Sequence, residues 1–281
     1  MTLPIWTIMT EPLAVIADPS NGTLSTGALL LRVGAGMVIG ACLGSFANAT
    51  AMRLVRDEPV IQPRSRCRTC NRTLTARELW PLVSWLVTGG ACHCGDSRIP
   101  ARYPAVELGF GLLLAAYAAA LTPASAIAFG LASTIMLICA LTDLDRLVLY
   151  FPLLMALIGG GLLMVSLAET GVIRWPVTLL EAIAGAGIGG ALPFAINRLY
   201  HAARGRNGFG AGDVWLLAAV GCWLGPSLCL FVFFVAAALG AVAGVLMMIR
   251  QQGTRHSRLP FGSLLGLVFM MTPLLAMVTP A

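Results

Sequence analysis

Long apolar runs separated by short polar segments dominate the chain. Each run is roughly 17 to 25 residues long, which is enough to cross a bilayer as a helix. The pattern predicts about eight membrane-spanning helices, at residues 27–51, 104–121, 124–141, 150–168, 175–196, 210–224, 227–249 and 261–278. The expected fold class is therefore an all-α polytopic membrane protein.

The polar positions divide the chain into four parts. We expect an N-terminal tail at residues 1–26, a first spanning helix at 27–51, a polar loop at 52–103 and a membrane core at 104–281. Composition supports this division, because 58% of the residues are hydrophobic and only 11% are charged. Such a balance excludes disorder and argues against an ordinary soluble domain. No cleavable signal is expected, because the first basic residue is Arg32.

The basic residues indicate how the chain is oriented. All 18 are arginines, and they lie mostly between the apolar runs. With the N-terminus in the periplasm, sixteen arginines fall on the cytoplasmic side and only Arg32 and Arg174 fall outside. This bias predicts a multi-pass membrane protein, surrounded by lipid, with residues 52–103 in the cytoplasm. The net charge of +6 therefore reflects orientation, and no nucleic-acid partner is expected.

Two cysteine pairs in the polar loop have the spacing of a metal site. Cys67 and Cys70 form a CxxC pair, and Cys92 and Cys94 follow after 21 intervening residues. Four thiolates suit a tetrahedral zinc ion, and a reducing cytoplasm disfavours disulfides. His93 is an alternative ligand to one thiolate, and an unliganded cysteine loop is the alternative to a site. Because the loop is short, we expect the zinc to be structural.

Two aspartates lie where apolar runs meet the cytoplasmic face. Asp143 ends the third run, and Asp213 follows Gly210 and Gly212 in a GxGD pattern. Glycines permit backbone angles that other residues avoid, so this loop could let a substrate backbone approach the carboxylate. A phosphate-binding loop fits poorly, since no strand precedes the glycines and no GK[ST] follows. Two carboxyl groups brought together can share one proton, one acting as acid and one as base.

Asp145 is a weaker candidate than Asp143. The two residues are separated by only one position, so a continuing helix would place them on different faces. A single aspartate at a membrane interface usually caps a helix or contacts water. The pairing of Asp143 with the glycine pattern at Asp213 is what favours a catalytic function.

Several motifs together carry a family resemblance. They are "GSFANATAMRL", "WPLVSWL", the cysteine pairs, "RYPAVEL", "TDLDRLVL" and "GFGAGDVWLLAAVGCWLG". From residue 44 onward the chain resembles the bacterial type IV prepilin peptidases, the bifunctional leader peptidase/methyltransferases of pilus and type II secretion systems. It departs from the family pattern at Tyr150, where proline is usual, at Trp215, where lysine is common, and in its CxC pair.

The resemblance implies an intramembrane aspartic protease with Asp143 and Asp213 as its catalytic pair. Its substrates would be prepilins or pseudopilins, cut at the cytoplasmic face of the membrane. The resemblance also implies that the new N-terminal residue is methylated from S-adenosylmethionine, and that the cysteines bind zinc. It assigns no oligomeric state.

Two other functions remain open from the residues alone. A transporter or proton-coupled channel would also use intramembrane aspartates and short glycine-broken helices. That hypothesis expects internal repeats, none of which is convincing here, and gives the cysteines no role. The second alternative is an assembly protein with an inactive protease fold. Retention of both Asp143 and Asp213 argues against it.

Overall fold

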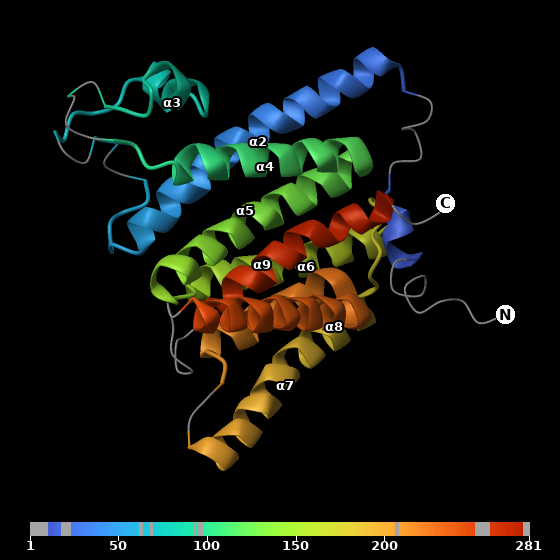
Figure 1. Ribbon diagram of the computed structural model, residues 1–281. Helices are drawn as coiled ribbons and strands as arrows, with labels where there is room; N and C mark the ends of the chain where they lie inside the picture. The colour runs from blue at the N-terminus through green and yellow to red at the C-terminus, as the bar shows by residue number, and fades with distance from the viewer. Residues whose placement is uncertain are drawn as a thin grey trace. The chain divides into compact units, whose positions relative to one another are not determined.

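The computed structural model consists of helices (Figure 1). It describes residues 11–17, 24–61, 64–67, 70–92, 94, 98–205, 208–250 and 259–277. With η for 3₁₀ helices, the elements are η1 (Glu11–Ile16), α2 (Thr26–Leu54), η3 (Ala76–Leu79), α3 (Val83–Val87), α4 (Arg102–Ala120), α5 (Pro123–Arg146), α6 (Phe151–Glu169), α7 (Leu179–Arg204), α8 (Ala211–Ile249), α9 (Phe261–Met271) and η4 (Thr272–Met277). The described residues form isolated β-bridges but no strand. The predicted all-α fold class is therefore confirmed.

Six helices in the described ranges are long and apolar enough to cross a membrane. They are α2, α4, α5, α6, α7 and α8. The protein is therefore a multi-pass membrane protein, as its apolar runs predict. The expected number of about eight spans is not confirmed. The difference arises at α8, which contains two predicted spans, and at α9, which is shorter than the span predicted there.

Helix α8 folds back on itself at Gly225. This glycine has φ 74° and ψ −179°, a conformation essentially limited to glycine, and Pro226 follows it. Cys229 Sγ lies 3.6 Å from the carbonyl oxygen of Leu217. A continuous helix would separate these residues by about 18 Å. The element is therefore two antiparallel helical segments, residues 211–224 and 226–249, joined where the sequence reads Gly-Pro.

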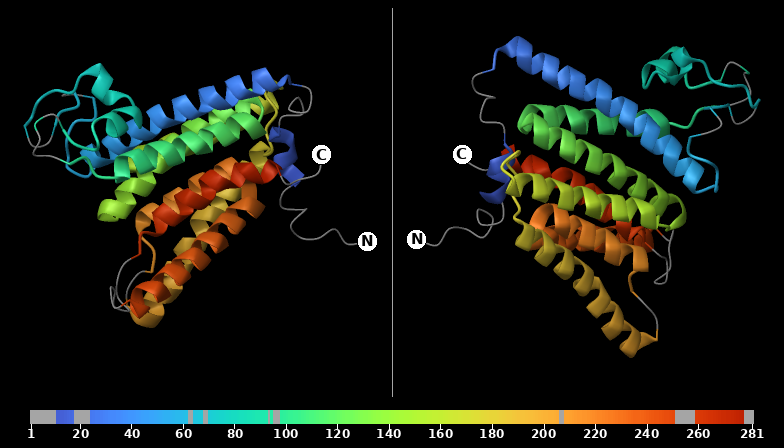
Figure 2. Two further views of the ribbon diagram at one scale, coloured as in Figure 1. Left: turned by 45° about the horizontal axis from the view of Figure 1, so that its top comes forward. Right: turned by 180° about the vertical axis from the view of Figure 1, so that it is seen from behind.

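Contacts divide the chain into two compact units. The larger unit comprises Met1–Asp18 and Ala120–Ala281, and the smaller comprises Pro19–Ala119. In the larger unit, α8 packs against α6, α7 and α9, and α9 packs against α5 (Figure 2). The smaller unit contains α2, most of α4 and the polar loop between them.

Small residues allow helix backbones to approach closely in both units. A methyl group added at Gly185 of α7 would lie 2.3 Å from the carbonyl oxygen of Gly221 in α8. In the smaller unit, a methyl group at Gly40 of α2 would lie 2.6 Å from the carbonyl oxygen of Phe110 in α4. No side chain fits either position. Packing through small residues is the usual basis of helix association in membranes.

An aromatic cluster forms the centre of the larger unit. Phe129 stacks on Trp175 with ring centroids 5.0 Å apart, and it also contacts Trp223 and Phe269. The indole N–H of Trp223 donates a hydrogen bond to the carbonyl oxygen of Leu157 at 2.7 Å. These contacts join α5, α6, α8 and α9, the helices that lead to the two aspartates.

Candidate active site

Asp143 is buried in the last turn of α5, with 5% of its surface exposed. Its Oδ2 accepts a hydrogen bond from the backbone N–H of Ser263 at 2.8 Å. The Ser263 hydroxyl lies 3.2 Å from the same oxygen and donates to the carbonyl oxygen of Ala140 at 2.7 Å. A carboxylate near the negative end of its own helix is electrostatically unfavourable. The free N–H groups at the start of α9 offset that cost.

Asp213 lies in the first turn of α8, where a helix favours negative charge. Its Oδ2 accepts a hydrogen bond from the backbone N–H of Gly210 at 2.9 Å. The backbone N–H of Asp213 donates in return to the carbonyl oxygen of Gly210 at 3.2 Å. This reciprocal pair closes the start of the helix, so the orientation of Asp213 is set by the loop before it.

The glycines of the GxGD pattern matter because they have no side chain, which lets neighbouring groups approach them closely. Gly210 has φ −71° and ψ 156°, which any residue can adopt, so the backbone freedom of a glycine is not used at this position. A methyl group added at Gly210 would lie 3.3 Å from Asp213 Oδ2. A methyl group at Gly212 would lie 2.8 Å from Leu149 Cβ. Both glycines therefore leave space that the carboxylate and Leu149 require.

Leu149 connects the surroundings of the two aspartates. Its side chain contacts Gly212, beside Asp213, and also Gly262. A methyl group at Gly262 would lie 3.1 Å from Asp143 Oδ2 and 3.2 Å from Leu149 Cδ1. The fold therefore brings together the two acids that the sequence singled out, whereas Asp145 is exposed.

Aromatic contacts support the two loops that carry the site. Phe209, just before Gly210, packs on Phe261 at the start of α9, with ring centroids 4.9 Å apart. Both rings also contact Phe233 of α8, at 6.1 Å in each case. The segment before Asp213 and the segment that binds Asp143 are thus held against one another through their side chains.

Asn197 of α7 holds the loop before Asp213, and the sequence reading missed it. Its Oδ1 accepts hydrogen bonds from the backbone N–H groups of Gly208 at 3.0 Å and Phe209 at 2.7 Å. Its Nδ2 donates to the carbonyl oxygen of Phe209 at 3.0 Å. The sequence did offer one sign of this role, because an asparagine stands at the end of an apolar run, ahead of a glycine loop. Its side-chain amide can accept from a backbone N–H and donate to a backbone carbonyl. Ser263 was also missed.

The four predicted metal ligands lie together in the smaller unit. The Sγ atoms of Cys67, Cys70, Cys92 and Cys94 are all within 4.8 Å of one another, and Cys67 Sγ lies 3.9 Å from Cys94 Sγ. A tetrahedral zinc ion with bonds of about 2.3 Å requires sulfurs about 3.8 Å apart, so the donor set fits a metal ion. The alternative ligand His93 lies outside the described residues.

Local backbone structure positions each cysteine pair. The backbone N–H of Cys67 donates to the carbonyl oxygen of Arg72 at 2.8 Å. The backbone N–H of Asn71 donates to the carbonyl oxygen of Cys67 at 3.0 Å. An isolated β-bridge between Ala91 and Arg98 brackets the second pair. These turns bring the thiols of each pair to one side, where the two pairs meet.

The fold and the site define a class of protein. It is a multi-pass helical membrane protein that has two neighbouring carboxyl groups and a cluster of four cysteines. Comparison with protein families gives a closer assignment. Residues 130–245 match the type IV leader peptidase family, and residues 38–121 match the bacterial peptidase A24 N-terminal domain. The chain belongs to the type IV leader peptidase family.

Individual relatives agree with the family match. A prepilin leader peptidase/N-methyltransferase of Aeromonas hydrophila is 34% identical, over 75% of this chain and 72% of the relative. One of Stutzerimonas stutzeri is 31% identical, over 82% of this chain and 86% of the relative. A type 4 prepilin-like proteins leader peptide-processing enzyme of Escherichia coli O78:H11 is 30% identical, over 81% and 88% respectively. No solved structure matches the chain.

Proposed function

We propose that this protein cleaves the leader peptide of type IV prepilins or type II secretion pseudopilins, and then N-methylates the new N-terminal residue. The names of its relatives describe both activities. The observation that carries the peptidase proposal is the approach of Asp143 and Asp213 across Leu149 and Gly262, in the part of the chain that matches the peptidase family.

The proposed mechanism uses the two aspartates on one water molecule. One carboxylate removes a proton from the water as it attacks the scissile carbonyl, and the protonated partner donates to the carbonyl oxygen. Two neighbouring carboxyl groups suit this division, because their joint ionisation is costly. The bonds from Ser263 and Gly210 fix one oxygen of each carboxyl group, which leaves the site preorganised. Neither carboxylate becomes covalently attached to the substrate.

The site is proposed to face the cytoplasm from the bacterial inner membrane, with the N-terminus in the periplasm. Asp143 and Asp213 lie at ends of their helices, which suits a bond cut at the membrane boundary. The arginine distribution supports this orientation. A basic leader followed by an apolar helix would then present its junction at the same depth.

The cysteine cluster is proposed to bind a structural zinc ion. The four thiolates leave no ligand position for water or substrate, which is typical of structural zinc sites. The segment that carries them has few buried side chains of its own, so a metal would supply much of its order.

S-adenosylmethionine is the proposed methyl donor, because its sulfonium group supplies an activated methyl. The acceptor is the amine that cleavage exposes. The test is to incubate purified protein in detergent with a model prepilin, with and without S-adenosylmethionine, and to measure the mass of the mature product. The proposal predicts a single internal cut and an added methyl group only when the donor is present. An intact prepilin across several substrates would refute the peptidase function.

A further inference from the structure

The polar loop of the smaller unit exposes an apolar surface that the peptidase mechanism does not use. It comes from the run LWPLVSWLV at residues 79–87, which includes α3. Five of its side chains are between 43% and 81% exposed, and we call them the apolar face: Leu79, Trp80, Val83, Leu86 and Val87. Apolar side chains that gather on a surface in this way mark an interaction site.

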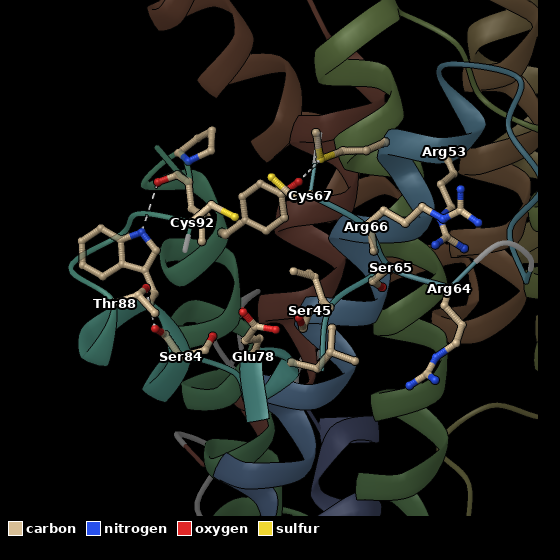
Figure 3. A pocket seen from close by; sticks show the side chains of 18 of the residues that line it. Ser45, Arg53, Arg64, Ser65, Arg66, Cys67, Glu78, Ser84, Thr88 and Cys92 are labelled. Carbon is tan, nitrogen blue, oxygen red and sulfur yellow. Dashed lines mark hydrogen bonds between the residues drawn. The ribbon is translucent and has the colours of Figure 1, made fainter. Parts of the chain in front are cut away.

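The two sides of α3 are arranged in the reverse of what water favours. Val83, Leu86 and Val87 stand at positions i, i+3 and i+4, so they share the outer side of the helix. Ser84 and Thr88 instead line a cavity of about 740 Å³ inside the unit (Figure 3). In water a helix turns its apolar side inward and its polar side outward. The arrangement therefore indicates that the outer side of α3 contacts an apolar medium.

Helix α4 gives the depth at which this segment lies. Its 19 residues extend about 28 Å, which is only just enough to cross the hydrocarbon core. Arg102, at the start of the helix, must therefore lie at the membrane boundary, and Glu107 lies about 7.5 Å inside it. The backbone N–H of Leu82, directly before α3, donates to Glu107 Oε2 at 2.7 Å. The start of α3 thus lies on the membrane side of the boundary.

A groove beside α2 gives the same depth independently. Leu79 lines this groove, of about 230 Å³, together with Cys42 and Phe46 of α2. Gly44, midway between them, is level with Glu107, because a methyl group added at Gly44 would lie 3.3 Å from Glu107 Cα. Phe46 is itself exposed, so the groove is continuous with the surface that α2 presents to lipid. The segment is therefore held at one level by contacts with both spanning helices of the unit.

We propose that residues 79–87 insert into the membrane interface, with the apolar face in the acyl chains of the leaflet that borders the start of α4. The proposal needs only the spanning helices and goes beyond the proposed function. Amphipathic segments at an interface lie about 5 to 10 Å deep, which matches the depth of Glu107. Tryptophan is enriched at this level, as Trp80 would be. Arg77 and Arg98, exposed on either side of the segment in the sequence, can extend to lipid phosphates.

Lipid fits the apolar face better than a second protein does. A soluble partner would have to reach side chains below the membrane boundary, where lipid already surrounds the exposed residues of α2. Insertion also accounts for Glu107, which is only 6% exposed. A carboxyl group facing lipid is costly, and the segment both covers this one and supplies its N–H partner. One consequence is that the cysteine cluster, whose pairs precede and follow the segment, is held close to the membrane surface.

The test is photo-labelling of the full-length protein in vesicles of phosphatidylcholine and phosphatidylglycerol. The vesicles carry a trace of phospholipid with a diazirine on its acyl chain, and labelled residues are identified by mass spectrometry. The proposal predicts label on residues 79–87 as dense as on the exposed residues of α2, and none on residues 71–73, which are exposed and polar. Label on α2 without label on residues 79–87 would overturn it.

A matched pair of variants checks that the apolar face itself causes the labelling. Leu86→Asp places a charge on this face and should lower the label on residues 79–87 about fivefold or more, with the label on α2 unchanged. Thr73→Asp makes the same change at an exposed position outside the face and should leave both labels unchanged. Equal labelling of the two variants would contradict the insertion.

Two further results would assign the apolar face to a protein and also overturn the proposal. Loss of the label on residues 79–87 when a model prepilin is added would make the substrate helix the occupant. Cross-links between two copies of this chain through residues 79–87, in place of lipid labelling, would make the face a self-association surface. Insertion predicts that the label persists in both experiments.

Discussion

The backbone N–H of Ser263 donates a hydrogen bond to Asp143 Oδ2 at 2.8 Å, although 120 residues separate the two. This bond places the start of α9 against the end of α5. Gly262 precedes Ser263 and has no side chain to displace the carboxyl group. The position of Asp143 therefore depends on a helix that carries no acid of its own.

Gly262→Ala should disrupt the site through this contact. The added methyl group would lie 3.1 Å from Asp143 Oδ2, so the carboxyl group must shift. Small displacements of a reacting group cost up to about 100-fold in rate, and we expect kcat/KM for prepilin cleavage to fall at least tenfold. Gly159→Ala is the matched control, because nothing lies within 4 Å of the added methyl group. Equal activity of the two variants would contradict the placement of α9.

Asn197→Ala should loosen the loop that carries Asp213. The substitution removes three hydrogen bonds to Gly208 and Phe209, each worth about 0.5 to 1.5 kcal/mol. We expect kcat to fall between about fivefold and 100-fold, together with a measurable loss of thermal stability. Asn197→Asp keeps the accepting oxygen and should retain more activity than the alanine variant. His201→Ala, on the same helix, is the control. If the Asp variant were no better than Ala, the loop would not depend on these bonds.

Each of Cys67, Cys70, Cys92 and Cys94 should be needed for metal binding. We predict about one zinc ion per chain by elemental analysis, and a large loss when any of the four is changed to serine. Cys42→Ser is the control, because Cys42 is exposed on α2, apart from the cluster. Stoichiometric zinc in all four variants would rule out this ligand set.

The topology predicts where fused reporters are active. A reporter placed after residue 204, at the end of α7, should report a cytoplasmic location, and one after Gly171, between α6 and α7, a periplasmic one. The arginines near each position are the reason: the first end carries Arg198 and Arg204, the second only Arg174. Inverted signals would place the aspartates on the opposite face of the membrane.

The sequence predicted those features of the fold that depend on local pattern. Apolar run lengths identified the helices, and the break between the predicted spans at 210–224 and 227–249 falls at Gly225-Pro226, where α8 turns back. Asp143 and Asp213 were recognisable because a carboxylate at the end of an apolar run is costly and requires a reason. The spacing of the cysteines was enough to predict their meeting.

The remaining features depend on contacts between distant parts of the chain. Ser263 gives no sign in its own surroundings that it binds Asp143, and Asn197 gives only a weak sign that it holds the glycine loop. Gly212 was attributed to backbone freedom, whereas the fold shows a close contact with Leu149, which depends on the packing of two segments. Such roles follow from tertiary structure and not from a motif.

The most direct test of the account is prepilin cleavage by wild-type, Asp143→Asn and Asp213→Asn proteins, compared at equal amounts in detergent. Asparagine keeps the size of each side chain but cannot take up or release a proton. The account predicts that both variants lose cleavage and that Asp145→Asn, next to the site but exposed, retains it. Cleavage by either Asp143→Asn or Asp213→Asn at the wild-type rate would contradict the two-aspartate mechanism.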